Sequence, residues 1–330
     1  MNAESLKHLA PIHPSVRQSL QAHSFFKLIC GASYRNTDFI SDLSYVFAMA
    51  GVQVIDVGAR PELVTAALAG ITRANLDQEQ QPLVMVSVGI NQDLHFLRVA
   101  KDFDKCTDHG YCANACPHDV FVGSEIRLQN CLGCDHCVIA CPEKALTLVP
   151  REAMHELHHL LGACFAAGAR ALEVHTGTGD RHELRNLLNL IHPWQTQIQL
   201  LAFSMGAHGQ AHAEIVQLAH DIVAQVGPEI IIQADGKPIS GRKGAKSTQP
   251  CLDLAQALIQ SQLPAFIQVS GGTNDLTGQL AKEQDIAIHG VGMGSYARKY
   301  VNLSPSEAIS EAEFREAIAK AKELVNSVKM

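Results

Sequence analysis

The stretch CLGCDHCVIACP, residues 131–142, decides how the middle of the chain folds. Its four cysteines stand at gaps of two, two and three residues, and Pro142 follows the last of them. This is the ligand run of bacterial two-cluster ferredoxins. The short gaps let three thiolates hold one iron–sulfur cluster from a tight loop, while the longer gap and the proline turn Cys141 toward another cluster. A second run is therefore expected.

A matching run lies upstream and ends on Pro117. Its four ligand positions are Cys106, His109, Cys112 and Cys116. The spacing is the same, except that a histidine occupies the second position. The residues that follow each run, 116–121 and 141–146, are similar to each other, which indicates an internal duplication.

Crossed ligation, in which each run gives its last cysteine to the other cluster, predicts two ligand sets. The first cluster is expected to be a [4Fe-4S] cluster bound by Cys116, Cys131, Cys134 and Cys137. The second is expected to use Cys106, Cys112 and Cys141. Its fourth iron would meet His109, neighbouring Asp108, water or nothing. The sequence therefore predicts either a [3Fe-4S] cluster or a [4Fe-4S] cluster with a non-cysteine ligand at this second site.

Zinc is the main alternative for the clustered cysteines. Zinc sites usually take cysteine pairs separated by a long spacer, not two four-position runs that each end in Cys-Pro. His109 fits either a direct iron ligand or a group that hydrogen-bonds to a ligand. Three further cysteines, Cys30, Cys164 and Cys251, are isolated in the sequence, and we expect them to be small buried apolar residues.

Composition excludes several other classes of protein. The chain has 330 residues, of which 47% are hydrophobic and 18% charged, and its net charge is −7. It lacks the basic surface of a nucleic-acid binder, so no nucleic-acid partner is expected. Residues 1–23 lack the continuous apolar core typical of a signal peptide, so none is expected, and no stretch reaches the roughly 18 apolar residues of a membrane span. We expect a cytoplasmic protein, in which clustered cysteines hold metal rather than disulfides.

Outside the cysteine-rich segment, short β-branched runs alternate with helical patterns. Eight such runs are found, at 27–31, 52–58, 82–89, 171–177, 198–205, 229–235, 265–272 and 286–294. They predict an α/β fold, a closed (β/α)8 barrel of the TIM type, with an open doubly wound sheet as the alternative. We expect the barrel in 1–94 and 151–330, and a ferredoxin-like α+β insert in 95–150, in the loop after the third strand. Residues 304–330 are expected to form a last, amphipathic helix, capped by Ser304 or Ser306.

Such an insert lies at the carboxyl ends of the strands, which is the functional face of these barrels. Glycine-rich loops after the seventh and eighth strands could hold a phosphate or flavin phosphate with backbone amides, although glycines also simply end strands. The predicted ligand-binding residues are Ser270, Gly271, Gly272, Gly292, Gly294 and Ser295. The loop after the sixth strand carries Arg242, Lys243 and Lys246, which could assist or only face solvent.

Four residues at strand ends are of the types that act as acids and bases. They are Asp56, Glu173, His175 and Asp235. Barrel enzymes place catalytic groups at these positions. Strand-end carboxylates also cap helices, so the sequence assigns no catalytic residue.

The chain resembles the cyanobacterial light-dependent period protein family (LdpA). The resemblance is carried by residues 26–33 (FKLICGAS), the two cysteine runs and residues 235–241 (DGKPISG). It implies a redox-active iron–sulfur protein that feeds the photosynthetic electron-transport state, and so light intensity, into the circadian clock. It also implies clock proteins and a sensor histidine kinase as partners, and no enzyme activity with an assigned substrate. His109 departs from a full eight-cysteine pattern.

Two functional hypotheses follow. The first is a redox sensor, in which the state of the clusters changes the affinity for a protein partner. The alternative is an oxidoreductase that passes electrons from the clusters to a flavin or other phosphate-bearing ligand at the barrel mouth. A plain electron carrier would need only residues 106–141, so the rest of the chain argues for binding or signalling.

Overall fold

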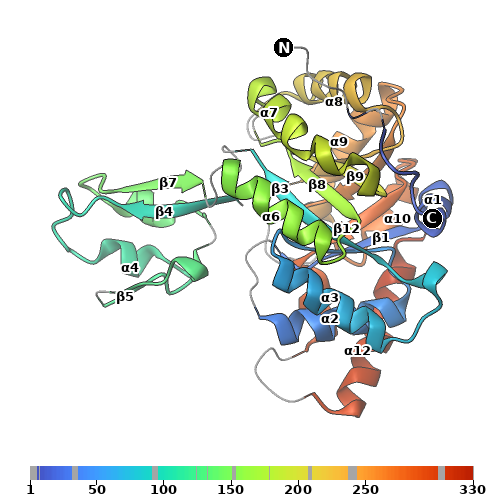
Figure 1. Ribbon diagram of the computed structural model, residues 1–330, viewed down its shortest axis with the longest axis horizontal. Helices are drawn as coiled ribbons and strands as arrows, with labels where there is room; N and C mark the ends of the chain where they lie inside the picture. Colours follow the sequence, from blue (N-terminus) through green and yellow to red (C-terminus); the bar gives the residue numbers. More distant parts are fainter. Residues whose placement is uncertain are drawn as a thin grey trace.

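Eight parallel strands close into a barrel (Figure 1). The computed structural model describes residues 6, 8–31, 36–90, 96–123, 125–131, 133–150, 154–177, 179–206, 210–236, 244–303 and 309–329. The barrel strands are β1 (Phe25–Ile29), β2 (Val54–Gly58), β3 (Leu83–Gly89), β8 (Ala171–His175), β9 (Leu200–Gly206), β10 (Ile231–Asp235), β11 (Phe266–Ser270) and β12 (Gly290–Met293). β1 pairs with β2 on one side and with β12 on the other, which closes the sheet. The predicted closed TIM-type barrel is confirmed, and the open-sheet alternative is wrong.

Helices surround the barrel, and α2, α3 and α12 cover one side of it (Figure 1). Their bounds are α1 (Pro14–Gln21), α2 (Thr37–Ala50), α3 (Pro61–Arg73), η1 (Gln78–Gln80), α6 (Met154–Ala166), α7 (Arg181–Ile191), η4 (His192–Gln197), α8 (His212–Val226), α9 (Ala245–Gln260), α10 (Thr277–Glu283), α11 (Ser295–Val301) and α12 (Glu311–Ser327). Among the helices that the structure describes, none combines the length and the apolar character needed to cross a membrane.

Local sequence signals set the helix ends. The Asn36 side chain accepts a hydrogen bond from the Phe39 N–H and begins α2, and Gly51 ends that helix with a φ of +83°. Ser310 and Glu313 form a capping box at the start of α12. Ser310 therefore caps α12 in place of the predicted Ser304 or Ser306, which lie outside the described residues.

The inside of the barrel changes from apolar to polar along the strands. Near the amino ends the inner side chains pack against α1. This apolar layer comprises Ile12, Val16, Leu20, Phe25, Val54, Leu83, Met85, Ala171, Leu200, Ala202 and Ile231. Nearer the carboxyl ends stand buried or half-buried polar residues, namely Lys27, Asp56, Ser87, Glu173, His175, Ser204, Gln233, Asp235, Gln268 and Ser270. Burying charges costs several kcal/mol per ion, so packing alone does not account for this polar layer.

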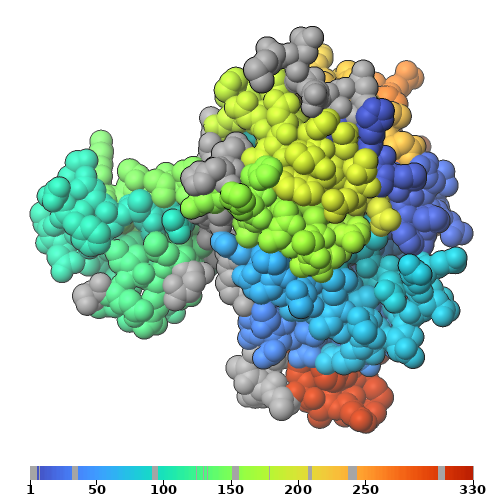
Figure 2. All heavy atoms as spheres, in the orientation of Figure 1, coloured from blue at the N-terminus to red at the C-terminus, as the bar shows by residue number. Residues whose placement is uncertain are grey.

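Residues 96–150 fold outside the barrel, between β3 and α6, and protrude to one side (Figures 1 and 2). The elements are β4 (Leu97–Lys101), α4 (Tyr111–Ala115), β5 (Phe121–Val122), β6 (Glu125–Ile126), η3 (Leu128–Asn130), α5 (His136–Ala140) and β7 (Leu146–Pro150). β4 pairs antiparallel with β7, so the first and last strands of the protruding segment lie side by side. The segment has a small core of its own, in which Val99, Val120 and Leu146 pack with cysteines.

Candidate metal centres and the barrel mouth

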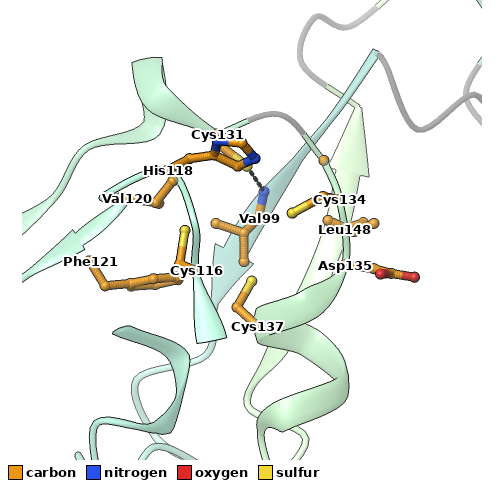
Figure 3. Close-up of a pocket in the computed structure, with 11 residues that line it drawn as sticks. Val99, Cys116, His118, Val120, Phe121, Cys131, Cys134, Asp135, Cys137 and Leu148 are labelled. Atoms are coloured by element: carbon orange, nitrogen blue, oxygen red, sulfur yellow. Dashed lines mark hydrogen bonds between the residues drawn. The ribbon is translucent and has the colours of Figure 1, made fainter. Parts of the chain in front are cut away.

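Four cysteines line one pocket in the protruding segment (Figure 3). They are Cys116, Cys131, Cys134 and Cys137, the residues predicted to share the first cluster. Their sulfur atoms point toward a shared space in the close-up (Figure 3). Val99 from β4 and Leu148 from β7 help to enclose that space.

Local backbone geometry brings these cysteines together. Cys116 directly follows α4, whereas Cys137 lies within α5. Between Cys131 and Cys137 the chain turns through two left-handed residues, Gly133 with φ +71° and Asp135 with φ +59°. Glycine adopts this conformation without strain, and aspartate tolerates it better than most residues. The tight turn lets three cysteines of one run face the last cysteine of the other.

The pocket concentrates thiols in apolar surroundings. Its empty space is about 260 Å³, open solvent at the mouth included. Burial, together with the neighbouring thiols of Cys116, Cys131 and Cys134, raises the pKa of Cys137 to about 11. The Val99 N–H donates a hydrogen bond to Cys131 Sγ at 3.3 Å. Asp135 also borders the pocket, but its carboxylate points away from the sulfur atoms (Figure 3). Four sulfur donors in a hollow lined mainly by apolar side chains, one of them already accepting an amide hydrogen bond, fit an iron–sulfur cluster.

The second predicted ligand set lies in the same segment. Cys106, Cys112 and Cys141 all pack in its core. The Asp108 N–H donates to Cys106 Sγ, and the Ala145 N–H donates to Cys141 Sγ, both at 3.3 Å. The Asp108 side chain is 94% exposed and lies 3.8 Å from the Lys101 amine. Asp108 is thus directed to solvent and to a lysine.

One residue that the sequence analysis missed joins this second group. A ring nitrogen of His109, the Cys141 sulfur and a carboxylate oxygen of Glu143 all lie within 4.8 Å of one another. Glu143 also accepts a hydrogen bond from the Thr107 hydroxyl at 2.9 Å. Burial opposes the change, but the hydrogen bonds from Thr107 and His109 lower the pKa of Glu143. The one sequence signal was its place directly after Cys141-Pro142, where the other run has His118.

The four strand-end acids and bases lie in the polar layer of the barrel mouth. Lys27 and Glu173 form an ion pair whose side chains are 0% and 2% exposed. Gln233 Nε2 donates to Glu173 Oε1 at 3.2 Å and to Asp235 Oδ1 at 3.0 Å, and its Oε1 accepts from Gln268. Among the described residues, Gln268 Oε1 is the buried side-chain oxygen without a hydrogen-bond partner. The hydrogen-bonding groups of this polar layer are therefore nearly all paired, with the Gln268 oxygen as the exception among the described residues.

His175 links two of the carboxyl groups. Its Nε2 lies 3.1 Å from Glu173 Oε1, and its Nδ1 lies 3.4 Å from the Ser204 hydroxyl, which in turn contacts Asp235. Burial raises the pKa of Asp235. Burial and the Glu173 charge raise the pKa of Asp56 to about 7, while Ser87 donates a hydrogen bond to Asp56 at 2.6 Å. Although burial opposes it, Lys27 and His175 lower the pKa of Glu173 to about 2. The pKa values of Asp56 and Asp235 are thus raised, whereas that of the neighbouring Glu173 is lowered. Carboxyl groups with such different pKa values in one network are suited to acid–base chemistry.

The predicted phosphate loop after β11 is packed against the start of α9. Gly271 and Gly272 have φ values of +71° and +87°. A Cβ on Gly272 would lie 2.1 Å from the Ser247 carbonyl oxygen, so only glycine fits. The Gly272 carbonyl accepts hydrogen bonds from the hydroxyls of Ser247 and Thr248, at 2.9 and 3.1 Å. These contacts account for the glycines by packing, and the phosphate or flavin site stays a prediction.

The other residues of that prediction also have structural roles. The Ser270 carbonyl accepts the Gly236 N–H at 2.9 Å, and a Cβ on Gly292 would lie 2.8 Å from Gln268 Nε2. Gly294 precedes α11, and Ser295 begins it. Lys246 is exposed in α9, whereas Arg242 and Lys243 lie outside the described residues, as do Ala32, Ser33 and 237–241.

The three isolated cysteines are buried, as predicted. Cys30, Cys164 and Cys251 are all 0% exposed. Burial raises the pKa values of Cys30 and Cys164 to about 12, and it raises that of Cys251 as well. Cys251 Sγ donates to the Thr248 carbonyl at 2.9 Å. These thiols are structural.

A family model described as the light dependent period A C-terminal domain matches residues 165–329. A protein named Light dependent period A, from Synechococcus elongatus, is 36% identical over 275 residues, which cover 82% of this chain and 76% of that protein. The chain belongs to the light dependent period A family. The resemblance seen in the sequence is thereby confirmed.

Solved structures similar to this light dependent period A family member share only its fold. The YdjI aldolase from Escherichia coli K12 has a TM-score of 0.50 at 9% identity, covering 96% of this chain and 94% of that one. A Rubisco-like protein from Rhodopseudomonas palustris has a TM-score of 0.51 at 10% identity, covering 97% of this chain and 69% of that one. At such identities the likeness supports the barrel and no activity.

Proposed function

We propose that residues 96–150 form a ferredoxin-like module with two iron–sulfur clusters, and that the protein passes their redox state on as light-dependent input to a circadian clock. One observation carries the proposal. Cys116, from the upstream run, lines the same pocket as Cys131, Cys134 and Cys137 of the downstream run. Crossed ligation of two clusters requires this convergence, and a zinc site built from neighbouring cysteines does not.

The clock role rests on the family. The related protein from Synechococcus elongatus is named for a light-dependent period. A clock input must reach other proteins, so we propose clock or signalling proteins as partners.

The surface of the protruding segment supports a protein partner there. Large apolar side chains that are exposed in the described residues are Phe103, Tyr111, Val122, Ile139 and Leu276. All except Leu276 belong to this segment. A partner that binds these exposed apolar side chains would lie close to the cysteines and therefore to the proposed clusters. Gain or loss of an electron changes the charge beneath this surface and hence the affinity for the partner.

Anaerobic purification tests the cluster proposal. We expect iron and acid-labile sulfide in equal amounts and a broad iron–sulfur absorbance. Cys134→Ser removes a ligand of the first cluster and should lower the iron content by about half. Cys251→Ser is the matched control, because a serine hydroxyl can also donate to the Thr248 carbonyl. Zinc in place of iron, or equal loss in both variants, would refute the proposal.

The polar layer of the barrel mouth favours a second candidate function, an oxidoreductase. Burial of charged groups lowers the stability of the fold, and the barrel mouth buries Lys27, Glu173 and Asp56. Buried ionisable groups with shifted pKa values are typical of reaction sites. The clusters would relay electrons to a flavin or other phosphate-bearing ligand, and the acids and bases would move protons on its substrate. Acid release of a flavin in a one-to-one ratio with the chain would favour the enzyme. An iron–sulfur spectrum alone, with no organic phosphate released, favours the sensor.

A further inference from the structure

Two hydrogen bonds fix the position of the proton on the His109 ring. The Tyr111 backbone N–H donates to His109 Nδ1 at 3.1 Å. An amide N–H can only donate, so Nδ1 offers its lone pair and carries no proton. The neutral ring therefore has its proton on Nε2, which contacts Glu143 Oε2. The imidazole donates to the carboxylate and accepts from the backbone.

This arrangement conflicts with iron binding by His109 itself. A neutral histidine that binds a metal through Nε2 carries its proton on Nδ1 and donates it to an acceptor. Here Nδ1 faces the Tyr111 N–H, another donor, so two donors would meet. Binding through Nδ1 would displace that N–H and leave it without its acceptor. Either mode needs the turn from 109 to 111 to rebuild.

Glu143 has no such conflict. One of its oxygens, Oε2, lies 3.8 Å from Cys141 Sγ, a predicted cluster ligand. The other, Oε1, is held by the Thr107 hydroxyl at 2.9 Å. A carboxylate oxygen has more than one lone pair, so Oε2 can accept the His109 proton and still bind a metal. The carboxylate is thus oriented from two sides and stands beside the thiolate.

We propose that Glu143 is the non-cysteine iron ligand of the second cluster, and that His109 is a positioning residue that holds the carboxylate through Nε2–H. This rests on the proposed function and replaces His109 by Glu143 at the fourth corner. Carboxylate oxygen binds iron less strongly than thiolate sulfur does, because thiolates are the softer ligands that such clusters select. The Glu143 side chain is 27% exposed, so the corner that it holds is open to solvent and exchangeable.

The test uses the full chain, reconstituted with iron and sulfide without oxygen. Ferricyanide then serves as oxidant: a four-iron cluster that releases one ferrous ion and gives one electron to ferricyanide leaves a three-iron cluster. Glu143→Gln keeps the size of the side chain and removes the charge. It should hold about one iron fewer per chain than wild type before ferricyanide is added, and on oxidation by one electron it should give the full three-iron paramagnetic signal without releasing a further ferrous ion. Glu125→Gln, an exposed carboxylate paired with Arg127 in the same segment, is the matched control and should behave as wild type.

The role of His109 has its own readout. His109→Gln should keep the full iron content at reconstitution and lose the fourth iron several-fold faster in ferricyanide. Pulsed paramagnetic resonance of the reduced wild type should show no strong ¹⁴N coupling of a directly bound imidazole. Such a coupling, or a full iron content in Glu143→Gln, would overturn the inference while leaving two clusters in place. Wild type without iron and sulfide would instead refute the proposed function itself.

Discussion

Phe96 packs edge-on against His175, with ring centroids 5.1 Å apart and ring planes at 64°. Phe96 directly precedes β4, and His175 ends β8 in the barrel mouth. Val99 lies three residues further along the chain, within β4, and its N–H donates a hydrogen bond to Cys131 Sγ. Three residues of strand span about 10 Å. The first cysteine pocket and the barrel network are therefore joined by one short, hydrogen-bonded piece of chain.

Removal of the Phe96 ring should uncouple the two regions. The ring also fills the space above Gly89, where a Cβ would lie 2.2 Å from it. In Phe96→Ala we expect unchanged iron content, because Phe96 is not among the residues that line the cysteine pocket. Histidine side-chain NMR should show that reduction of the clusters shifts the His175 resonances in wild type and not in the variant. Equal shifts in both proteins would mean that the contact transmits nothing.

Removal of one partner of the buried Lys27–Glu173 ion pair should cost more stability than removal of both charges. Lys27→Met leaves the Glu173 charge buried without its partner and should destabilise the barrel by about 3–5 kcal/mol. Lys27→Met with Glu173→Gln should recover more than half of that loss. Lys320→Met, which breaks an exposed pair with Glu316, is the control and should cost less than about 1 kcal/mol. The free energies of unfolding of all these variants can be measured by urea unfolding, followed by the fluorescence of Trp194, the single tryptophan.

Asp56 should make the barrel less stable as the pH rises. Its pKa goes from 3.8 to about 7 on folding, so between these values the folded state keeps a proton that the unfolded state has lost. Stability therefore falls as the pH rises through this window. Asp56→Asn stays neutral, and its free energy of unfolding should exceed that of wild type by about 4 kcal/mol at pH 8, with the gap nearly vanishing near pH 4. Glu173 acts in the opposite sense, but its window lies below pH 4.5. A constant gap across this range would contradict the assignment.

Much of the fold could be predicted from the sequence, because strands and helices leave regular patterns of apolar residues along the chain. Buried strands such as Leu83 to Val86 leave a continuous apolar run, and eight strand patterns that alternate with helical patterns predict a (β/α)8 barrel. The cysteine pocket was predictable for a similar reason, since the spacing around Cys134 fixes which thiols can share one centre. Both signals are local repeats that survive without knowledge of the tertiary contacts.

The parts that were missed depend on contacts between distant residues. Glu143 meets His109 across 34 positions, and no spacing rule links them. Lys27 pairs with Glu173 across 146 positions, so the sequence showed an acid at a strand end but not the lysine that neutralises it. The start of α12 is a different case: Ser310 with Glu313 is a capping box that could have been preferred over the earlier serines.

Lys101 should raise the reduction potential of the proposed second cluster. A hydrogen bond to Cys106, together with the nearby Asp108 and Cys112, raises the pKa of this lysine. A fixed positive charge beside a cluster favours the reduced state, which carries one more negative charge. Lys101→Met should therefore lower the potential of the second cluster, on the order of tens of millivolts, and leave the first almost unchanged. Lys144→Met removes an exposed lysine of the same segment and should move neither potential. Redox titration monitored by paramagnetic resonance separates the two clusters, and a shift confined to the first cluster would show that Cys106 belongs to the other centre.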